Sequence, residues 1–190
     1  MDWTMYLETE RLILRDWKDE DREPFAAMGQ DPEVMRYFPG LLSRQDSDAL
    51  VDRAIAKQSA DGFCFVPVEE KATGKFLGFT GLSRPSYPKP LPFDPCVEIG
   101  WRFCRQAWGK GFASEAAREW LRFGFATLGL EEIVAFTTVT NLKSQAVMRR
   151  IGMTTHSRDD FPHPMLDSDH PLVAHVLYRL SKEAWAQAAA

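Results

Sequence analysis

RQAWGKGFASEAAREWLRFGFATLGL, residues 105–130, is the stretch of sequence that decides the fold. It begins as a turn with glycines at positions 109 and 111 and continues with apolar residues at the spacing of an amphipathic helix. We expect this helix to end at Gly129 and to bury one face, formed by Ala113, Ala116, Ala117, Trp120, Leu121, Gly124, Phe125 and Leu128. A glycine-rich turn before a helix leaves backbone N–H groups without helical acceptors, so it suits a pyrophosphate.

Three classes of phosphate-bearing ligand compete for this turn. A nucleoside triphosphate loop needs GxxxxGK followed by a hydroxyl residue, but Lys110 lies between the two glycines and no such hydroxyl follows it. A dinucleotide fingerprint needs GxGxxG, and here Ser114 takes the third position, with Glu131 or Glu132 available for a ribose. Too few strand and helix units follow the turn for a doubly wound domain. A coenzyme A thioester needs the same helix end beside a strand, which residues 96–103 provide.

The flanking sequence alternates strand and helix signals. Before the turn it predicts a strand at 11–15, a helix opened by the acids of 16–23, a second helix around 49–57, an antiparallel hairpin at 63–82 and a strand at 96–103. The proline-rich segment 83–95 must be an extended loop. After the turn we expect a strand at 131–140, a helix at 141–151 stopped by Gly152, and strands at 153–158 and 175–180.

Composition narrows the class of protein. A chain of 190 residues that is 45% hydrophobic suits one domain, which we place over residues 1–190. The net charge of -4 provides no basic field for nucleic acid. The three cysteines have no CxxC spacing, which argues against disulfides and structural zinc and favours a reducing cytosol. Without a targeting segment or a long apolar run, we expect a soluble cytoplasmic protein with no membrane partner.

Five motifs in order resemble the GNAT superfamily of acetyl-CoA-dependent N-acetyltransferases, in particular the branch of the ribosomal-protein alanine acetyltransferases. They are TERLILR at 9–15, EIGWRF at 98–103, Q-x-x-G-x-G at 106–111, N-x-x-S-x-x-V-M-x-R-x-G-M at 141–153 and HVLYRL at 175–180. The resemblance covers nearly the whole chain. It implies an α/β fold, a GNAT-like mixed twisted sheet of six to seven strands flanked by about four helices, with acetyl-CoA between the central strands.

The resemblance also implies which residues bind the cofactor. Backbone amides from Gln106 to Ala113 would hold the pyrophosphate, and amides near Arg102 would bind the pantetheine arm and polarise the acetyl carbonyl. Lys110 either contacts a phosphate or is solvated, and Gln106 could be a plain surface residue. Asn141 would contact the cofactor arm, cap its helix, or do both. The full set is Trp101, Arg102, Phe103, Gln106, Gly109, Lys110, Gly111, Phe112, Ala113, Asn141 and Ser144.

Two residues are candidates for proton transfer. Glu98 would take the proton of the attacking ammonium, although a strand carboxylate of this kind could instead pair with an arginine. Ser144 would protonate the departing thiolate, because Met148 stands where a tyrosine acid might be sought. Either His163 or His170 could replace Glu98 as base or line the acceptor pocket. The histidine spacings match no zinc signature, so we expect no metal.

The sequence thus predicts acetyl transfer from acetyl-CoA to a primary amine by direct attack in a ternary complex. The acceptor could be a protein amino terminus or a small amine. Two alternatives remain at this point: a non-catalytic acyl-CoA sensor, and a dinucleotide-binding enzyme. The resemblance also makes a homodimer plausible.

Overall fold

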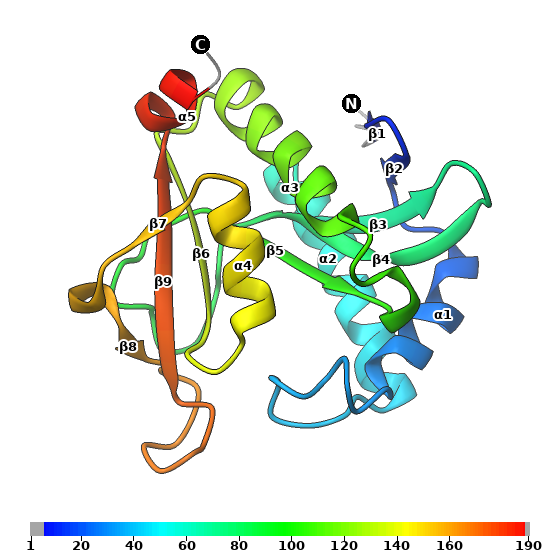
Figure 1. Cartoon of the computed structure of the whole chain (residues 1–190). Coiled ribbons are helices and arrows are strands. Elements are labelled where there is room, and N and C mark those ends of the chain that lie inside the picture. The colour runs from blue at the N-terminus through cyan, green and yellow to red at the C-terminus, as the bar shows by residue number, and fades with distance from the viewer. Residues whose placement is uncertain (1–5, 189–190) are drawn as a thin grey trace. The chain divides into compact units, whose positions relative to one another are not determined.

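The computed structural model describes residues 6–188, which fall into two compact units. The first unit contains the residues up to 83 together with 100–119, and the second contains 84–99 together with the residues from 120 onward. Strand β5 (Glu98–Phe103) and helix α3 (Phe112–Arg122) each contribute residues to both units (Figure 1). The glycine turn that connects these two elements belongs wholly to the first unit.

The first unit contains four antiparallel strands, paired in chain order: β1 (Tyr6–Glu8), β2 (Leu12–Arg15), β3 (Phe65–Glu70) and β4 (Lys75–Ser83). The end of β5 runs beside β4, where the Cys104 N–H donates to the Leu77 carbonyl at 2.9 Å. A Cβ atom on Gly78 would lie only 2.2 Å from the Arg102 carbonyl oxygen. Glycine at position 78 therefore permits the close approach of the strand that carries the predicted cofactor amides.

Two helices cover the β3–β4 hairpin. Helices α1 (Arg22–Gly29) and α2 (Arg44–Asp61) pack against each other, and they contact β4 and β3 respectively. Helix α2 begins at a capping box in which the Ser43 hydroxyl accepts from the Asp46 N–H. The core of this unit is formed by Phe25, Met28, Val34, Val51 and Cys104, with Trp17, Leu50, Phe76, Phe79 and Trp108 packed around them.

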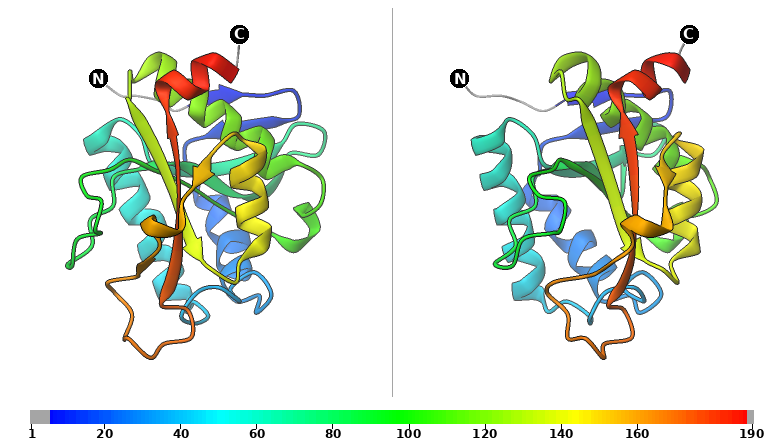
Figure 2. Two further views of the ribbon diagram at one scale, coloured as in Figure 1. Left: turned by 60° about the vertical axis from the view of Figure 1, so that its left-hand side comes forward. Right: turned by 90° about the vertical axis from the view of Figure 1, so that its left-hand side faces the viewer.

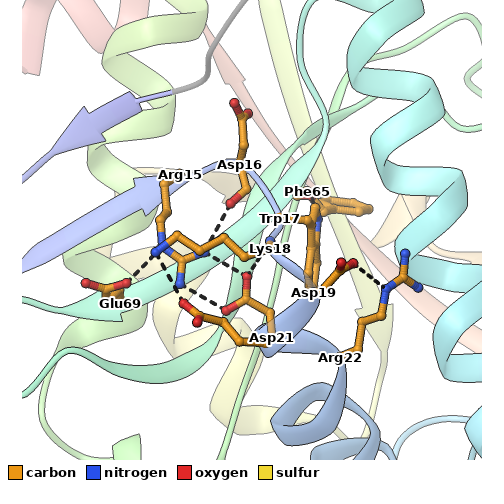
Figure 3. A network of polar contacts seen from close by, with 10 residues as sticks. Arg15, Asp16, Trp17, Lys18, Asp19, Asp21, Arg22, Phe65 and Glu69 are labelled. Carbon is orange, nitrogen blue, oxygen red and sulfur yellow. Dashed lines mark hydrogen bonds and ion pairs between the residues drawn. The ribbon is translucent and has the colours of Figure 1, made fainter.

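A buried ion pair fixes the entry into α1. The Arg15 guanidinium donates to both carboxylate oxygens of Asp21, at 2.7 and 2.9 Å, and to Glu69 at 2.8 Å (Figure 3). Asp21 also accepts from the Lys18 N–H at 2.8 Å, and its side chain is only 2% exposed. Hydrogen bonding to Asp21, opposed by burial, raises the pKa of Arg15. Both charges are therefore fully partnered, as buried charges must be.

The second unit has a mixed sheet. Strand β6 (Glu132–Thr138) runs parallel to the start of β5, with Glu98 opposite Val134, and antiparallel to β9 (Ala174–Ser181). The short strands β7 (Thr154–Thr155) and β8 (Phe161–Pro162) both pair with β9. Helix α4 (Leu142–Arg150) contacts β6, and α5 (Lys182–Ala188) follows β9 (Figure 2).

The predicted mixed α/β fold is confirmed, with more elements than expected. The described residues contain nine strands and five α-helices, where six or seven strands and about four helices were predicted. The additions, β1, β8 and α5, are three, two and seven residues long, too short to carry a clear hydrophobic period. The strand predicted at 153–158 shrinks to two residues, and α3 gives way to a turn of π-helix over Phe123–Thr127 before reaching Gly129.

The structure also bears on the dinucleotide-binding alternative and on the question of membrane spans. Antiparallel pairing dominates both units, which is inconsistent with a doubly wound parallel dinucleotide domain. Within residues 6–188, no helix combines the length and the apolar character needed to cross a bilayer.

We expect Asp21→Asn to lower the free energy of unfolding by roughly 3 kcal/mol, because it weakens the pairing of a buried guanidinium. The matched control is Asp52→Asn, which removes the 2.7 Å ion pair of Arg22 to a side chain that is 65% exposed. The control should lose less than about 1 kcal/mol, since exposed ion pairs contribute little. Urea unfolding at neutral pH measures both, and equal losses would contradict a special role for the buried pair.

Candidate functional site

The turn between β5 and α3 depends on two glycines with left-handed backbone. Gly109 has a φ of +74° and Gly111 a φ of +81°, a conformation that side-chain-bearing residues rarely adopt. A Cβ atom at Gly109 would meet no heavy atom within 4 Å, so the space beside this residue is open. The Glu115 N–H donates to the Gly111 carbonyl at 3.0 Å, and the amides before it have no acceptor within the helix. The turn therefore has open space and backbone amides of the kind that a pyrophosphate requires.

Arg11 fastens this turn from a distant part of the chain. Its guanidinium donates to the Lys110 carbonyl at 3.0 Å and to the Glu115 carboxylate at 2.7 Å, and lies 4.5 Å from the Phe112 ring centroid. Burial alone would raise the pKa of Glu115, but hydrogen bonds from Thr9 and Arg11 outweigh it and lower the pKa. The sequence analysis did not predict this contact. No local signal reveals it, because the partners are 104 residues apart.

The predicted cofactor-binding side chains around the turn differ in exposure. Gln106 and Lys110 are exposed, whereas Phe112 is buried and Ala113 is partly buried. Phe103 is also buried, and its carbonyl accepts from the Trp108 indole N–H at 2.8 Å, which ties the end of β5 to the turn. A ligand at this segment would therefore contact mainly backbone amides and the open space beside Gly109.

Arg102 differs from the other side chains of β5. The residue as a whole is partly exposed, but its Nε and Nη1 atoms are shielded from solvent. The guanidinium carbon lies 4.0 Å from the Phe38 ring centroid and 5.4 Å from that of Phe79. Burial lowers the pKa of Arg102 to about 10, so the guanidinium stays charged at neutral pH.

In the second unit, Asn141 caps α4 and holds Ser144 in its first turn. The Asn141 Oδ1 accepts from the Ser144 N–H at 3.2 Å, and its Nδ2 donates to the Thr137 hydroxyl at 3.0 Å. Helix capping, one of the two roles considered, is therefore seen directly. Ser144 is partly buried, and Met148 is a core residue at 2% exposure.

Glu98 lies at the start of β5 and is partly buried. Its charge acts on Tyr87 in the proline-rich loop and on Cys96, which directly follows that loop. Burial, with the charge of Glu98 as a further cause, raises the pKa of Tyr87. Burial and the hydrogen bond to Asp94, with a smaller effect from Glu98, raise the pKa of Cys96 to about 12. Near neutral pH, the tyrosine and the cysteine are therefore protonated, and the charges in this neighbourhood are the carboxylates of Glu98 and Asp94.

The structure brings His163 together with His175 and not with His170. The His163 and His175 ring centroids are 4.8 Å apart, and the Tyr87 ring lies 5.2 Å from that of His163. Burial and the neighbouring His175 lower the pKa of His163 to about 4. The His175 Nδ1 lies 3.1 Å from the Val173 carbonyl oxygen. Sequence reasoning did not single out His175, because no spacing rule pairs it with His163.

The described residues also form a hollow apart from the predicted catalytic groups. A hollow of about 660 Å³ is lined by Arg84, Pro85, Asp94, Pro95, Cys96, Val97, Glu132 and Val134. Its lining includes neither Glu98, Ser144 nor the histidines. Among residues 6–188, no group of three or more histidine, cysteine, aspartate or glutamate side chains is placed to hold a metal ion.

The fold is that of an α/β protein with an open glycine turn before a helix, and comparison with known proteins identifies its family. Residues 11–154 match the acetyltransferase (GNAT) domain, so the chain belongs to the GNAT acetyltransferase family and is an acyltransferase. This family uses acetyl-CoA. The matches establish the family without selecting the ribosomal-protein branch.

Three relatives illustrate the similarity. The uncharacterized protein YkkB of Bacillus subtilis is 33% identical over 77% of this chain and 84% of its own. The FsC-acetyl coenzyme A-N(2)-transacetylase of Aspergillus fumigatus is 31% identical over 94% of this chain and 77% of its own. The crystal structure of a GNAT-family acetyltransferase from Bacillus anthracis superposes with a TM-score of 0.77 at 26% identity, covering 94% of this chain and 99% of that one.

We expect acid to destabilise the protein partly through His163. Because its pKa in the folded protein is about 4, below the ordinary 6.5, the unfolded chain binds the proton more readily. The free energy of unfolding should therefore fall as the pH drops from about 6.5 toward 4. Urea unfolding across this range should show a smaller fall in His163→Gln than in the wild type. The exposed His156 supplies the control variant, His156→Gln, which should behave as the wild type. An unchanged pH dependence in His163→Gln would rule this residue out.

Proposed function

We propose that this chain, as a single N-acetyltransferase domain over residues 1–190, transfers the acetyl group of acetyl-CoA to a primary amine. One observation carries the proposal: the left-handed glycines at 109 and 111 leave an open turn of backbone amides that Arg11 holds in place. Acetyl-CoA, when bound, supplies the activated acetyl thioester. Amides from Gln106 to Ala113 hold its pyrophosphate, and those of Trp101, Arg102 and Phe103 bind the pantetheine arm and donate to the acetyl oxygen.

The second unit supplies the groups that move protons. Glu98 accepts the proton of the acceptor ammonium, because only the neutral amine has a lone pair for attack. Ser144 donates a proton to the departing thiolate. Asn141 positions this serine by capping α4, and in this role it supports the binding of the cofactor arm.

The acceptor amine is either a protein amino terminus, as in the ribosomal-protein branch of the family, or the amine of a small molecule. The Aspergillus fumigatus relative is named an acetyl coenzyme A-N(2)-transacetylase, which supports transfer of the acetyl group to a nitrogen atom. The amine attacks the thioester directly in a ternary complex.

We expect acetyl-CoA to raise the melting temperature of the wild-type protein, and this stabilisation to be weaker in Gly109→Ala. The added methyl group enters the open space beside the turn, and the affinity should fall about tenfold, or about 1.4 kcal/mol. Calorimetric titration gives the dissociation constants.

Gly129→Ala is the matched control for this variant. Gly129 also has a left-handed backbone, at a φ of +68°, with open space around a Cβ atom, but it lies outside the turn. Both variants should lose similar stability, and only Gly109→Ala should lose affinity. Equal affinities, or a wild-type protein that acetyl-CoA does not stabilise, would contradict the proposed cradle.

We expect Glu98→Gln to lower turnover about 10²-fold while acetyl-CoA affinity stays within about twofold, since the amide cannot accept the proton. The loss should be largest near neutral pH, where the amine is mostly protonated, and should shrink as the pH approaches the pKa of the amine. Thiol release measures turnover. Glu131→Gln, at a side chain that is 85% exposed, should match the wild type. Unchanged turnover in Glu98→Gln would make Glu98 a structural residue.

A further inference from the structure

Arg102 carries a charge for which the described protein offers no counter-charge. Among residues 6–188, no hydrogen-bond acceptor reaches its Nε or Nη1, and both atoms are shielded from solvent. Its contacts are with the faces of Phe38 and Phe79. Other arginines of the first unit behave differently: Arg11, Arg15, Arg22, Arg44 and Arg105 each lie within 4 Å of a carboxylate.

The aromatic rings do not account for this arrangement. A cation over an aromatic face is stabilised modestly, whereas removing a guanidinium from water without an anion is far more unfavourable. Burial alone lowers the pKa of Arg102, and no neighbouring charge contributes to the shift. An unpaired buried charge of this kind persists when function requires it, and the fold loses stability by keeping it.

The guanidinium selects the chemistry of its partner. Its planar set of donors matches the two oxygens of a carboxylate or the oxygens of a phosphate, so the missing partner is an oxyanion. Phe38 is 38% exposed, so apolar surface is available beside the guanidinium for the body of a ligand. The proposed function gives the pyrophosphate of acetyl-CoA to the turn at 106–113, and we take the acceptor as the source of the anion for Arg102; a loss of acetyl-CoA affinity in an Arg102 variant would point to another phosphate of the cofactor instead.

We propose that Arg102 binds a carboxylate or phosphate group carried by the acceptor, so that the substrate class is an amine bearing an oxyanion. This inference rests on the proposed function and narrows its acceptor. It also separates two roles of one residue, because the backbone amide of Arg102 serves the cofactor while the side chain selects the acceptor. Arg102→Met removes only the second role.

The test compares matched pairs of amines. Each amino acid is assayed against its carboxamide, and phosphoethanolamine against ethanolamine, with thiol release from acetyl-CoA as the readout. The wild type should prefer the anionic member of at least one pair by tenfold or more in kcat/KM, because the uncharged member leaves the guanidinium without its partner. The amino acid and phosphoethanolamine arms distinguish a carboxylate from a phosphate.

Arg102→Met should abolish this preference, chiefly through a higher KM for the anionic amine, while the affinity for acetyl-CoA is unchanged. Arg102→Lys should keep part of the preference, because it retains the charge without the planar fork. Arg36→Met is the control, since Arg36 is exposed and its guanidinium carbon lies 5.8 Å from the Tyr37 ring centroid. The melting temperature of Arg102→Met should equal or exceed that of the wild type, because an unpaired buried charge has been removed.

Several results would overturn the inference. They are a wild type that acetylates the uncharged amines equally well, an Arg102→Met variant that keeps the preference, or one whose main loss is affinity for acetyl-CoA. A marked fall in the melting temperature of Arg102→Met would show that the guanidinium serves the fold. A wild type that acetylates no amine of either kind contradicts the proposed function itself, which separates the two failures.

Discussion

The turn before α3 can bind a ligand only if it keeps one geometry while some of its amides remain without partners. The contacts of Arg11 hold the turn in place without using those amides. Backbone groups without partners normally rearrange until they find one. Here the Lys110 carbonyl accepts from the Arg11 side chain, and the Glu115 carboxylate in the first turn of α3 accepts from both the backbone and side chain of Arg11. The N-terminal strand region thus supports the turn from outside, while at the start of the turn the Ala107 and Trp108 N–H groups donate to the Cys104 and Arg105 carbonyls.

Two arginines of the first unit, the buried Arg15 and the partly buried Arg102, show how charge can serve stability or function. Arg15 has two carboxylate partners, and its burial therefore fixes the path of the chain into α1. Arg102 has aromatic neighbours and no carboxylate within reach among the described residues. Since burying a charge is unfavourable in both cases, the difference lies in where the compensating anion comes from. In the first case the chain supplies it, and in the second we infer that the substrate does.

The sequence predicted those features that depend on local chemistry. The turn, α3 and the β3–β4 hairpin follow from glycine positions and apolar periods, and each was placed correctly. Features that depend on contacts across the chain could not be predicted. Nothing near Glu115 in sequence indicates Arg11, and nothing near Arg102 shows that it lacks a partner. In the same way, spacing suggested His163 or His170, whereas folding pairs His163 with His175.

The neighbourhood of His163 also bears on the choice of base in the second unit. A general base works best when its pKa lies near the working pH, and His163, with a pKa of about 4, binds a proton too weakly. Tyr87 and Cys96 keep their protons near neutral pH because burial raises their pKa values. The two histidines and Tyr87 therefore form an uncharged aromatic group that suits lining a pocket better than moving protons. This supports the proposal that Glu98, whose charge acts on Tyr87 and Cys96, accepts the proton of the amine.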